Sequence, residues 1–187
     1  MSKFSGKHQS GQGNSRFRVS CLLHIPLLVF SILATNSTTA SELHISHCLF
    51  GCPEGTSSDT QLVIRSIYAL AYNQENKVAD WAAYKVSVDS IGIATSLPRE
   101  AVADTFIEDT LRAIDYGTGD EANGLDRSAF VPLVSFAGTP YWNDVNYLTN
   151  MVPRSSALNR GAWYGLEWAV RNLANREGAI YVLTGPI

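Results

Sequence analysis

Apolar and β-branched positions in the first half of the chain predict a β-hairpin. The runs at residues 62–72 and 81–86 are rich in aromatic and β-branched side chains, and the polar residues 73–77 separate them. The stretch from 89 to 125 is polar, rich in Asp and weakly periodic. We therefore expect a long surface connection there, with one short helix at 99–111.

Two further short apolar runs follow near residue 130. Residues 130–136 are apolar enough for a strand, and residues 145–149 form a second short run. Between them, residues 137–140 contain the turn formers Gly and Pro. The pattern predicts strand, turn, strand.

A helix and a last strand are expected next. Apolar residues recur every three or four positions from Leu158 to Leu173, and Ser155 or Ser156 can cap the helix before Gly178 stops it. Residues 179–184 then predict a core strand. Strands and helices in this order indicate the α+β class, with one domain over residues 41–187.

The first 40 residues are typical of a secretion signal. Four cations precede an apolar run at 21–34, and small polar residues follow up to Ala40, where we expect cleavage. The run is shorter than the ~20 residues that span a bilayer, although an uncleaved membrane anchor is the alternative. Cleavage would leave a secreted or periplasmic protein without stable membrane association.

Export would place the chain where disulfides persist. Cys48 and Cys52 can then close a small loop, while Cys21 leaves with the signal. The same spacing could form half of a metal site, but the sequence contains no second Cys/His cluster downstream. A disulfide is the preferred interpretation.

The distribution of charged residues gives two opposing indications about binding to nucleic acid. Residues 41–187 carry 10 Lys and Arg against 17 Asp and Glu, which disfavours binding to a polyanion. Residues 127–187, however, carry five Arg and only three acidic residues. Arginine suits bidentate phosphate contact, although it is also an ordinary surface residue.

One face of the expected helix presents candidate ligand atoms. Asn159, Trp163 and Glu167 are four residues apart, so an amide and a carboxylate lie on one stripe. Oxygen atoms of these types could hold a hard cation near an Arg-rich loop. The alternative is a solvated helix face, with Trp163 as a core residue.

Several segments resemble the family of DNA/RNA non-specific endonucleases. They are Asp126–Leu133, Asn146–Pro153, Leu158–Trp163, Leu166–Glu167 and Tyr181–Pro186, preceded by Cys48–Pro53, Arg65–Leu70 and Ala79–Tyr84. The resemblance implies a mixed or antiparallel sheet with a ββα-metal motif. It implies that the chain hydrolyses phosphodiester bonds of DNA and RNA without regard to sequence, and it is compatible with a homodimer.

The resemblance also implies roles for individual residues. Asn159 matches the ligand of a single, mostly water-coordinated Mg²⁺, and Glu167 matches the carboxylate that orients a metal-bound water. Arg127 matches the arginine of the family's Asp-Arg-Gly-His signature, and Asn150 matches a polar site residue. Further substrate contacts are expected from Arg99, the nearest candidate for a second family arginine, and from Arg154 in the Arg-rich segment.

The signature itself departs from the family pattern at its last two positions. Ala129 stands where the family has its general-base His, and loss of such a base typically costs ~10² to 10⁴ in rate. Ser128 replaces Gly, which is tolerable at an ordinary backbone angle. We expect Asp126 to act as a cap or an arginine partner. His44 or His47 could fold back toward the site.

Three interpretations remain open at this stage. The chain is an impaired endonuclease, a non-catalytic homologue that binds nucleic acid and metal, or a remnant that does not fold. The third arises because relatives continue beyond the Thr-Gly-Pro at 184–186, so we expect the C-terminal part of the domain to be missing.

Overall fold

The computed structural model describes residues 44–54, 59–107, 109–111 and 124–186. The expected signal at 1–40 lies outside the described residues. Within the described part of the chain, no helix is long and apolar enough to cross a membrane.

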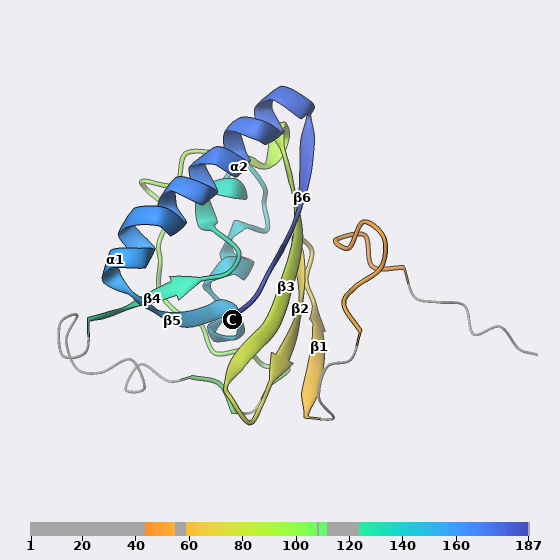
Figure 1. The fold of residues 1–187 in the computed structure, drawn as a ribbon, viewed down its shortest axis with the longest axis vertical. Helices are drawn as coiled ribbons and strands as arrows, with labels where there is room; N and C mark the ends of the chain where they lie inside the picture. The colour runs from red at the N-terminus through yellow and green to blue at the C-terminus, as the bar shows by residue number, and fades with distance from the viewer. Residues whose placement is uncertain (1–43, 55–58, 108, 112–123, 187) are drawn as a thin grey trace, which may run out of the picture. The chain divides into compact units, whose positions relative to one another are not determined.

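An antiparallel sheet forms the centre of the fold (Figure 1). Its strands are β1 (Thr60–Ile64), β2 (Tyr68–Asn73), β3 (Val78–Ser87) and β6 (Ala179–Thr184), in the order β1-β2-β3-β6. The predicted hairpin is confirmed, because β2 and β3 pair across the polar segment that separates them.

The first apolar run was wrongly predicted as one strand. Residues 62–72 contain parts of β1 and β2, which turn back on each other. The amide of Arg65 donates to the carbonyl of Tyr68 at 2.8 Å and closes this turn. Both strands are apolar, so hydropathy alone does not mark the break between them.

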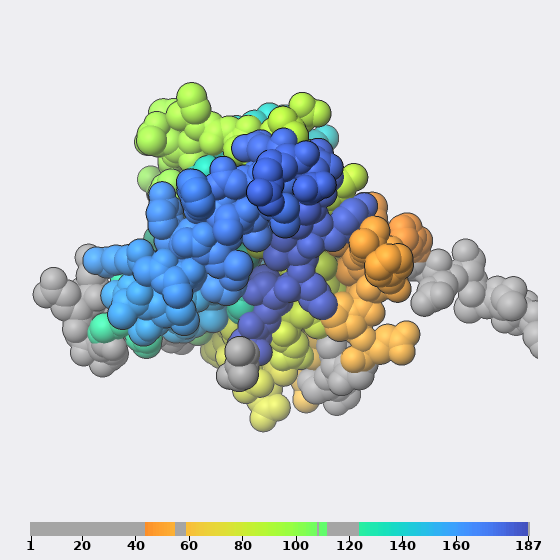
Figure 2. Space-filling view, turned by 45° about the horizontal axis from the view of Figure 1, so that its top comes forward, coloured from red at the N-terminus to blue at the C-terminus, as the bar shows by residue number. Residues whose placement is uncertain are grey.

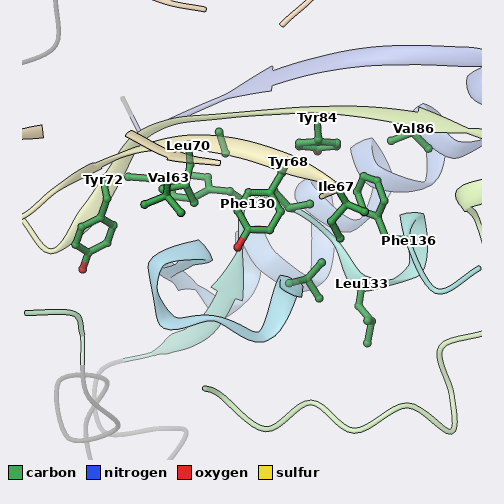
Figure 3. Close-up of a cluster of buried hydrophobic side chains, with 14 of the residues drawn as sticks. Val63, Ile67, Tyr68, Leu70, Tyr72, Tyr84, Val86, Phe130, Leu133 and Phe136 are labelled. Atoms are coloured by element: carbon green, nitrogen blue, oxygen red, sulfur yellow. The ribbon is translucent and has the colours of Figure 1, made fainter. Parts of the chain in front are cut away.

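Side chains alternate between the two faces of β2 and β3, as strand geometry requires. Tyr68, Leu70 and Tyr72 point into the main core that Figure 3 shows. In the same core, Tyr84 packs edge-on against Phe136 with 5.8 Å between ring centres. The small side chains Ala69, Ala71 and Ala83 face the other way, together with Trp81, and pack against Cys48. Cys48 and Cys52 form the expected disulfide. Figure 1 shows residues 44–54 and the helix α2 (Tyr164–Glu177) on opposite faces of the sheet.

A second, two-stranded sheet holds the signature. Strand β4 (Leu125–Ala129) pairs antiparallel with β5 (Met151–Ser155). The strands predicted at 130–136 and 145–149 are wrong. Residues 130–136 include the 3₁₀ turn η3 (Leu133–Ser135), and residues 145–149 overlap with the 3₁₀ turns η4 (Trp142–Asn146) and η5 (Leu148–Asn150).

Burial accounts for this error. Phe130, Val131 and Phe136 are buried beneath the main sheet, so their apolar character reflects core packing and not a pleated strand. Pro132 precedes η3 and has no amide hydrogen for a ladder. The hairpin therefore lies just outside the apolar runs.

The predicted helix is confirmed. It consists of α1 (Ser156–Leu158), a π turn η6 (Asn159–Trp163) and α2 (Tyr164–Glu177). The hydroxyl of Ser155 accepts from the amide of Leu158 at 3.3 Å. Gly178, with a φ of 84°, ends α2 in a conformation that favours glycine.

The short helix expected at 99–111 is wrong for the described residues 99–107 and 109–111, which are irregular. The carboxylate of Asp104 accepts from the amide of Phe106 at 2.9 Å, a local bond that competes with helix formation. Asp104 also pairs with Arg65 at 2.6 Å and accepts from Thr149 at 2.6 Å. This buried network holds the connection against the sheet and η5.

Strand β6 has the predicted bounds but not the predicted position. It pairs with β3 and with no other described strand, so it lies at the edge of the sheet. Leu183 is 60% exposed, unlike a residue of a core strand. Figure 2 shows α2 and β6 side by side at the surface.

Candidate active site

An open cleft of about 630 Å³ lies between the β4–β5 hairpin, the start of the helix and the connection after β3. Arg99, Arg127, Ala129, Asn159 and Glu167 all line it. The fold thus brings together five of the residues predicted for the site, although 68 positions separate the first from the last in sequence.

Strand β4 carries the signature residues. Arg127 and Ala129 are two positions apart, so they lie on the same face of the strand and both line the cleft. Arg127 is exposed, whereas Ser128 between them also lines the cleft but is buried in its wall. The strand therefore presents a guanidinium and a methyl group to the cleft.

Asp126 connects the hairpin to the helix. Its carboxylate accepts from Arg160 Nε and Nη2 at 3.0 and 2.9 Å, and from Ser156 Oγ at 2.7 Å. The hydrogen bonds from Arg160, Asn159 and Ser156 hold the pKa of Asp126 well below its usual range. Asp126 is thus an arginine partner, as expected, and an acceptor that stays ionised.

Asn159 is hydrogen-bonded at both ends of its carboxamide. Its Nδ2 donates to Asp126 Oδ2 at 2.9 Å, and its Oδ1 accepts from Ser128 Oγ at 2.7 Å. The side chain is partly buried and lies at the cleft wall. The oxygen expected to bind a cation is therefore held in one orientation.

Glu167 lies about two turns further along the helix and is largely buried. Its side chain is 19% exposed, and Arg171 Nη1 lies 3.8 Å from Oε2, beyond hydrogen-bond distance. Burial raises the pKa of Glu167, against the opposing effect of Arg171, Trp163 and Arg154. A carboxyl in this setting can take up and release a proton closer to neutral pH than an ordinary glutamate.

Arg154 lies behind the cleft wall. It is only 8% exposed, its guanidinium stacks 3.8 Å from the ring centre of Trp163, and Nη1 donates to Ser128 Oγ. Burial lowers its pKa. Arg154, predicted as a substrate contact, is not among the described residues that line the cleft. Trp163 packs on this arginine and is partly buried, in keeping with the core role preferred for it.

Asn150 is fully buried and bonded to the main chain. Its Oδ1 accepts from Val131 N at 2.9 Å, and its Nδ2 donates to Val131 O and Val145 O at 3.1 and 2.9 Å. It too is absent from the described lining of the cleft. Its contacts join the segment after β4 to η4, so the structure places it as a support for the hairpin.

Arg99 reaches the cleft because its connection is anchored nearby. Asn146 Nδ2 donates to the carbonyl of Pro98 at 3.1 Å, and Val102 exchanges backbone hydrogen bonds with Asn146 and Leu148 at 2.9 Å each. Arg99 itself is exposed. Sequence spacing contains no sign of these anchors.

Neither described histidine approaches the Ala129 position. His47 Nε2 donates to the carbonyl of Arg65 at 2.9 Å and lines a different hollow, together with Lys85. His44 is exposed and, like His47, is not among the described residues that line the cleft. The possibility that either histidine folds back into the site is not realised in the structure.

Comparisons with known proteins agree with this arrangement. Residues 48–187 match the family described as DNA/RNA non-specific endonuclease. The chain belongs to this family. It is 36% identical to the protein named Nuclease from Serratia marcescens over 170 residues, which cover 89% of this chain and 62% of that protein. It is 30% identical to Nuclease C1 from Cunninghamella echinulata over 145 residues, covering 74% of this chain and 55% of that protein.

A solved structure shares the fold. The chain superimposes with a TM-score of 0.60 and 26% identity on a chain from a study titled as the crystal structure of the EndoG/EndoGI complex, covering 67% of this chain and 53% of that one. The α+β fold with antiparallel sheets is therefore confirmed. The chain spans roughly half to three fifths of the length of these relatives.

The donor set of the cleft fits the metal chemistry of the family. Among the described residues there is no group of three or more His, Cys, Asp or Glu side chains placed to hold a metal ion. Asn159 Oδ1 is a hard oxygen donor, and the carboxylate of Glu167 lines the same cleft. Magnesium prefers oxygen ligands and usually keeps several waters, so one protein ligand with a nearby carboxylate suits it.

Two features of the site were missed by sequence reasoning. Arg160 forms the bidentate contact with Asp126, and Ser128 donates a hydrogen bond to Asn159 Oδ1. Arg160 had a signal, because it follows Asn159 in the matching segment and Asp126 was expected to pair with an arginine. Ser128 had none, since a hydroxyl in place of glycine gives no indication of its partner.

Proposed function

We propose that this chain binds the phosphodiester backbone of DNA and RNA in the cleft and acts as a Mg²⁺-dependent, sequence-nonspecific endonuclease. The observation that carries the proposal is the convergence of Arg99 and Arg127 on the same cleft as Asn159 and Glu167. Two exposed guanidinium groups beside hard oxygen donors suit a phosphodiester and a divalent cation.

Each cleft residue has a definite part in this proposal. Arg127 and Arg99 bind the phosphate oxygens and stabilise charge that develops on them during cleavage. Asn159 Oδ1 holds the cation, and Glu167 accepts a hydrogen bond from water next to it. When bound, Mg²⁺ supplies Lewis-acid stabilisation of the phosphate and of the leaving oxygen. Contacts of this kind address the backbone and not the base edges, so cleavage is independent of sequence.

Ala129 limits what the chain does as it stands. A methyl group cannot accept a proton from the attacking water, and no described histidine lines the cleft. We therefore expect cleavage slower by ~10² to 10⁴ than with a histidine at this position. This observation favours the second candidate function, a non-catalytic homologue that binds nucleic acid and metal.

Location and assembly complete the proposal. We propose that the protein is secreted or periplasmic, which is supported by the Cys48–Cys52 disulfide and by the basic and apolar pattern of residues 1–40. That the protein forms a homodimer remains a prediction.

The test restores the missing base. Ala129→His is compared with Ala129→Asn, which adds a polar side chain of moderate size that does not act as a base at neutral pH. We expect Ala129→His to cut plasmid DNA and RNA in Mg²⁺ at a rate ~10² to 10⁴ above the unmodified chain, and Ala129→Asn to show no gain. A folded Ala129→His protein that binds DNA in a salt-dependent way but does not cut it would reject the endonuclease and leave the binding function.

A further inference from the structure

Ser128 occupies a junction between a buried cation and the proposed metal ligand. Its hydroxyl accepts a hydrogen bond from Arg154 and donates one to Asn159 Oδ1. We propose that Ser128 is a positioning residue that fixes the carboxamide of Asn159 so that its oxygen faces the cation. This inference rests on the proposed function, in which Asn159 is the residue that binds the metal ion.

The direction of the Ser128 hydrogen follows from its partners. A guanidinium carries donors and no acceptor, so Arg154 Nη1 must donate to Ser128 Oγ. The hydroxyl hydrogen is then free to point to Asn159 Oδ1, 2.7 Å away. Arg154 is itself held by its stacking on Trp163 and by burial. The order of donation is therefore Arg154 to Ser128 to Asn159.

The other end of the carboxamide is held just as firmly. The two oxygens of Asp126 accept hydrogen bonds from Arg160, and Oδ2 also accepts from Asn159 Nδ2 at 2.9 Å. A rotated Asn159 would place its oxygen against this carboxylate, and the hydroxyl hydrogen of Ser128 would lose its acceptor on Asn159. Both neighbours thus disfavour the rotated form.

Preorganisation is compatible with metal binding. A carbonyl oxygen has two acceptor positions, and Ser128 occupies one of those on Asn159 Oδ1, which leaves the second for a cation. Partners that orient a metal ligand typically change the metal affinity by 10- to 100-fold when they are removed. The glycine that the family carries at this position has no hydroxyl, so the arrangement is a property of this chain.

The experiment measures the affinity for Mn²⁺, a spectroscopic probe for the proposed Mg²⁺ site, by electron paramagnetic resonance of the free ion. Ser128→Ala should raise the dissociation constant by about 10-fold or more, and Ser128→Thr, which keeps the hydroxyl, should restore most of the affinity. Ser135→Ala is the matched control. Ser135 is 1% exposed, and its hydroxyl has no hydrogen-bond partner in the described part of the chain.

A second measurement follows the carboxamide directly. The side-chain NH₂ signals of Asn159 in ¹⁵N-labelled protein should be distinct in the unmodified chain and should broaden or converge in Ser128→Ala, without any metal present. This readout also decides the matter if a variant loses affinity through reduced stability, because it is recorded on the folded fraction.

The outcomes separate this inference from the proposed function. If Asn159→Ala abolishes Mn²⁺ binding while Ser128→Ala keeps both the affinity and the NH₂ signals of the unmodified chain, the role of Ser128 is overturned and the metal site stands. If Asn159→Ala binds Mn²⁺ as the unmodified chain does, the proposed metal site itself fails.

Discussion

Replacing Asn150 separates a supporting role from a role in the site. The side chain is fully buried and makes three hydrogen bonds to the backbone of Val131 and Val145. Asn150→Ala removes all three and leaves their buried main-chain partners without this side chain. At about 1 kcal/mol for each bond, the loss is about 3 kcal/mol, and more where water cannot enter.

That loss is large against the total stability of a domain, which is typically 5–15 kcal/mol. Urea unfolding followed by tryptophan fluorescence should therefore show a clearly lower midpoint at an unchanged slope. The folded fraction should keep the Mn²⁺ affinity of the unmodified chain, because Asn150 does not line the described cleft.

Asn159→Ala is the matched control, since it also removes a carboxamide but from a partly buried position at the cleft. It should lose Mn²⁺ binding with a smaller loss of stability. The reasoning is refuted if Asn150→Ala unfolds at the same urea concentration as the unmodified chain and yet loses binding of metal or DNA. Asn150 would then act in the site, as the resemblance implied.

Two further predictions concern the charged residues of the cleft. Because burial raises the pKa of Glu167, its carboxylate is protonated at a higher pH than an ordinary glutamate, and Mn²⁺ affinity should fall as the pH drops through that raised value. Glu167→Gln should remove this step from a titration between pH 4 and 8, and a step that persists in the variant contradicts the assignment. Arg127→Ala and Arg99→Ala should each weaken DNA binding uniformly across sequences and reduce the salt slope of log affinity by about 1, as measured by fluorescence anisotropy. Arg176→Ala, an exposed arginine outside the described cleft lining, should leave the slope unchanged, and an equal effect in all three variants would point to diffuse charge.

The helix and β6 could be predicted closely because their signals are local. A period of 3.6 residues, a serine cap and Gly178 define the helix within its own sequence, and β6 follows at once. The β4–β5 hairpin lies outside the residues predicted for it, because Phe130 and Val131 are apolar for a different reason. They are buried under the main sheet. Which apolar residues pack against a distant element is a property of the tertiary fold, and local periodicity does not contain it.

Some residues of the site could likewise be predicted from the sequence, and others could not. Arg127, Asn159 and Glu167 lie in segments that resemble the family, and the structure places all three at one cleft. Asn150 lies in such a segment too, and Arg154 comes directly after it in the Arg-rich stretch, but both side chains are buried. A sequence pattern shows that a residue type recurs at a position; it does not distinguish a side chain that faces the substrate from one that holds the wall behind it.

The π turn at Asn159–Trp163 gives the spacing of the helix residues a meaning of its own. In a regular α-helix, with 3.6 residues per turn, positions eight apart lie about 80° away from each other around the axis, whereas positions seven apart nearly coincide. The π turn winds less per residue and absorbs one extra residue. Asn159 and Glu167 therefore share the cleft at a spacing of eight. A relative that lacks the π turn would need a spacing of seven to bring the same two groups together.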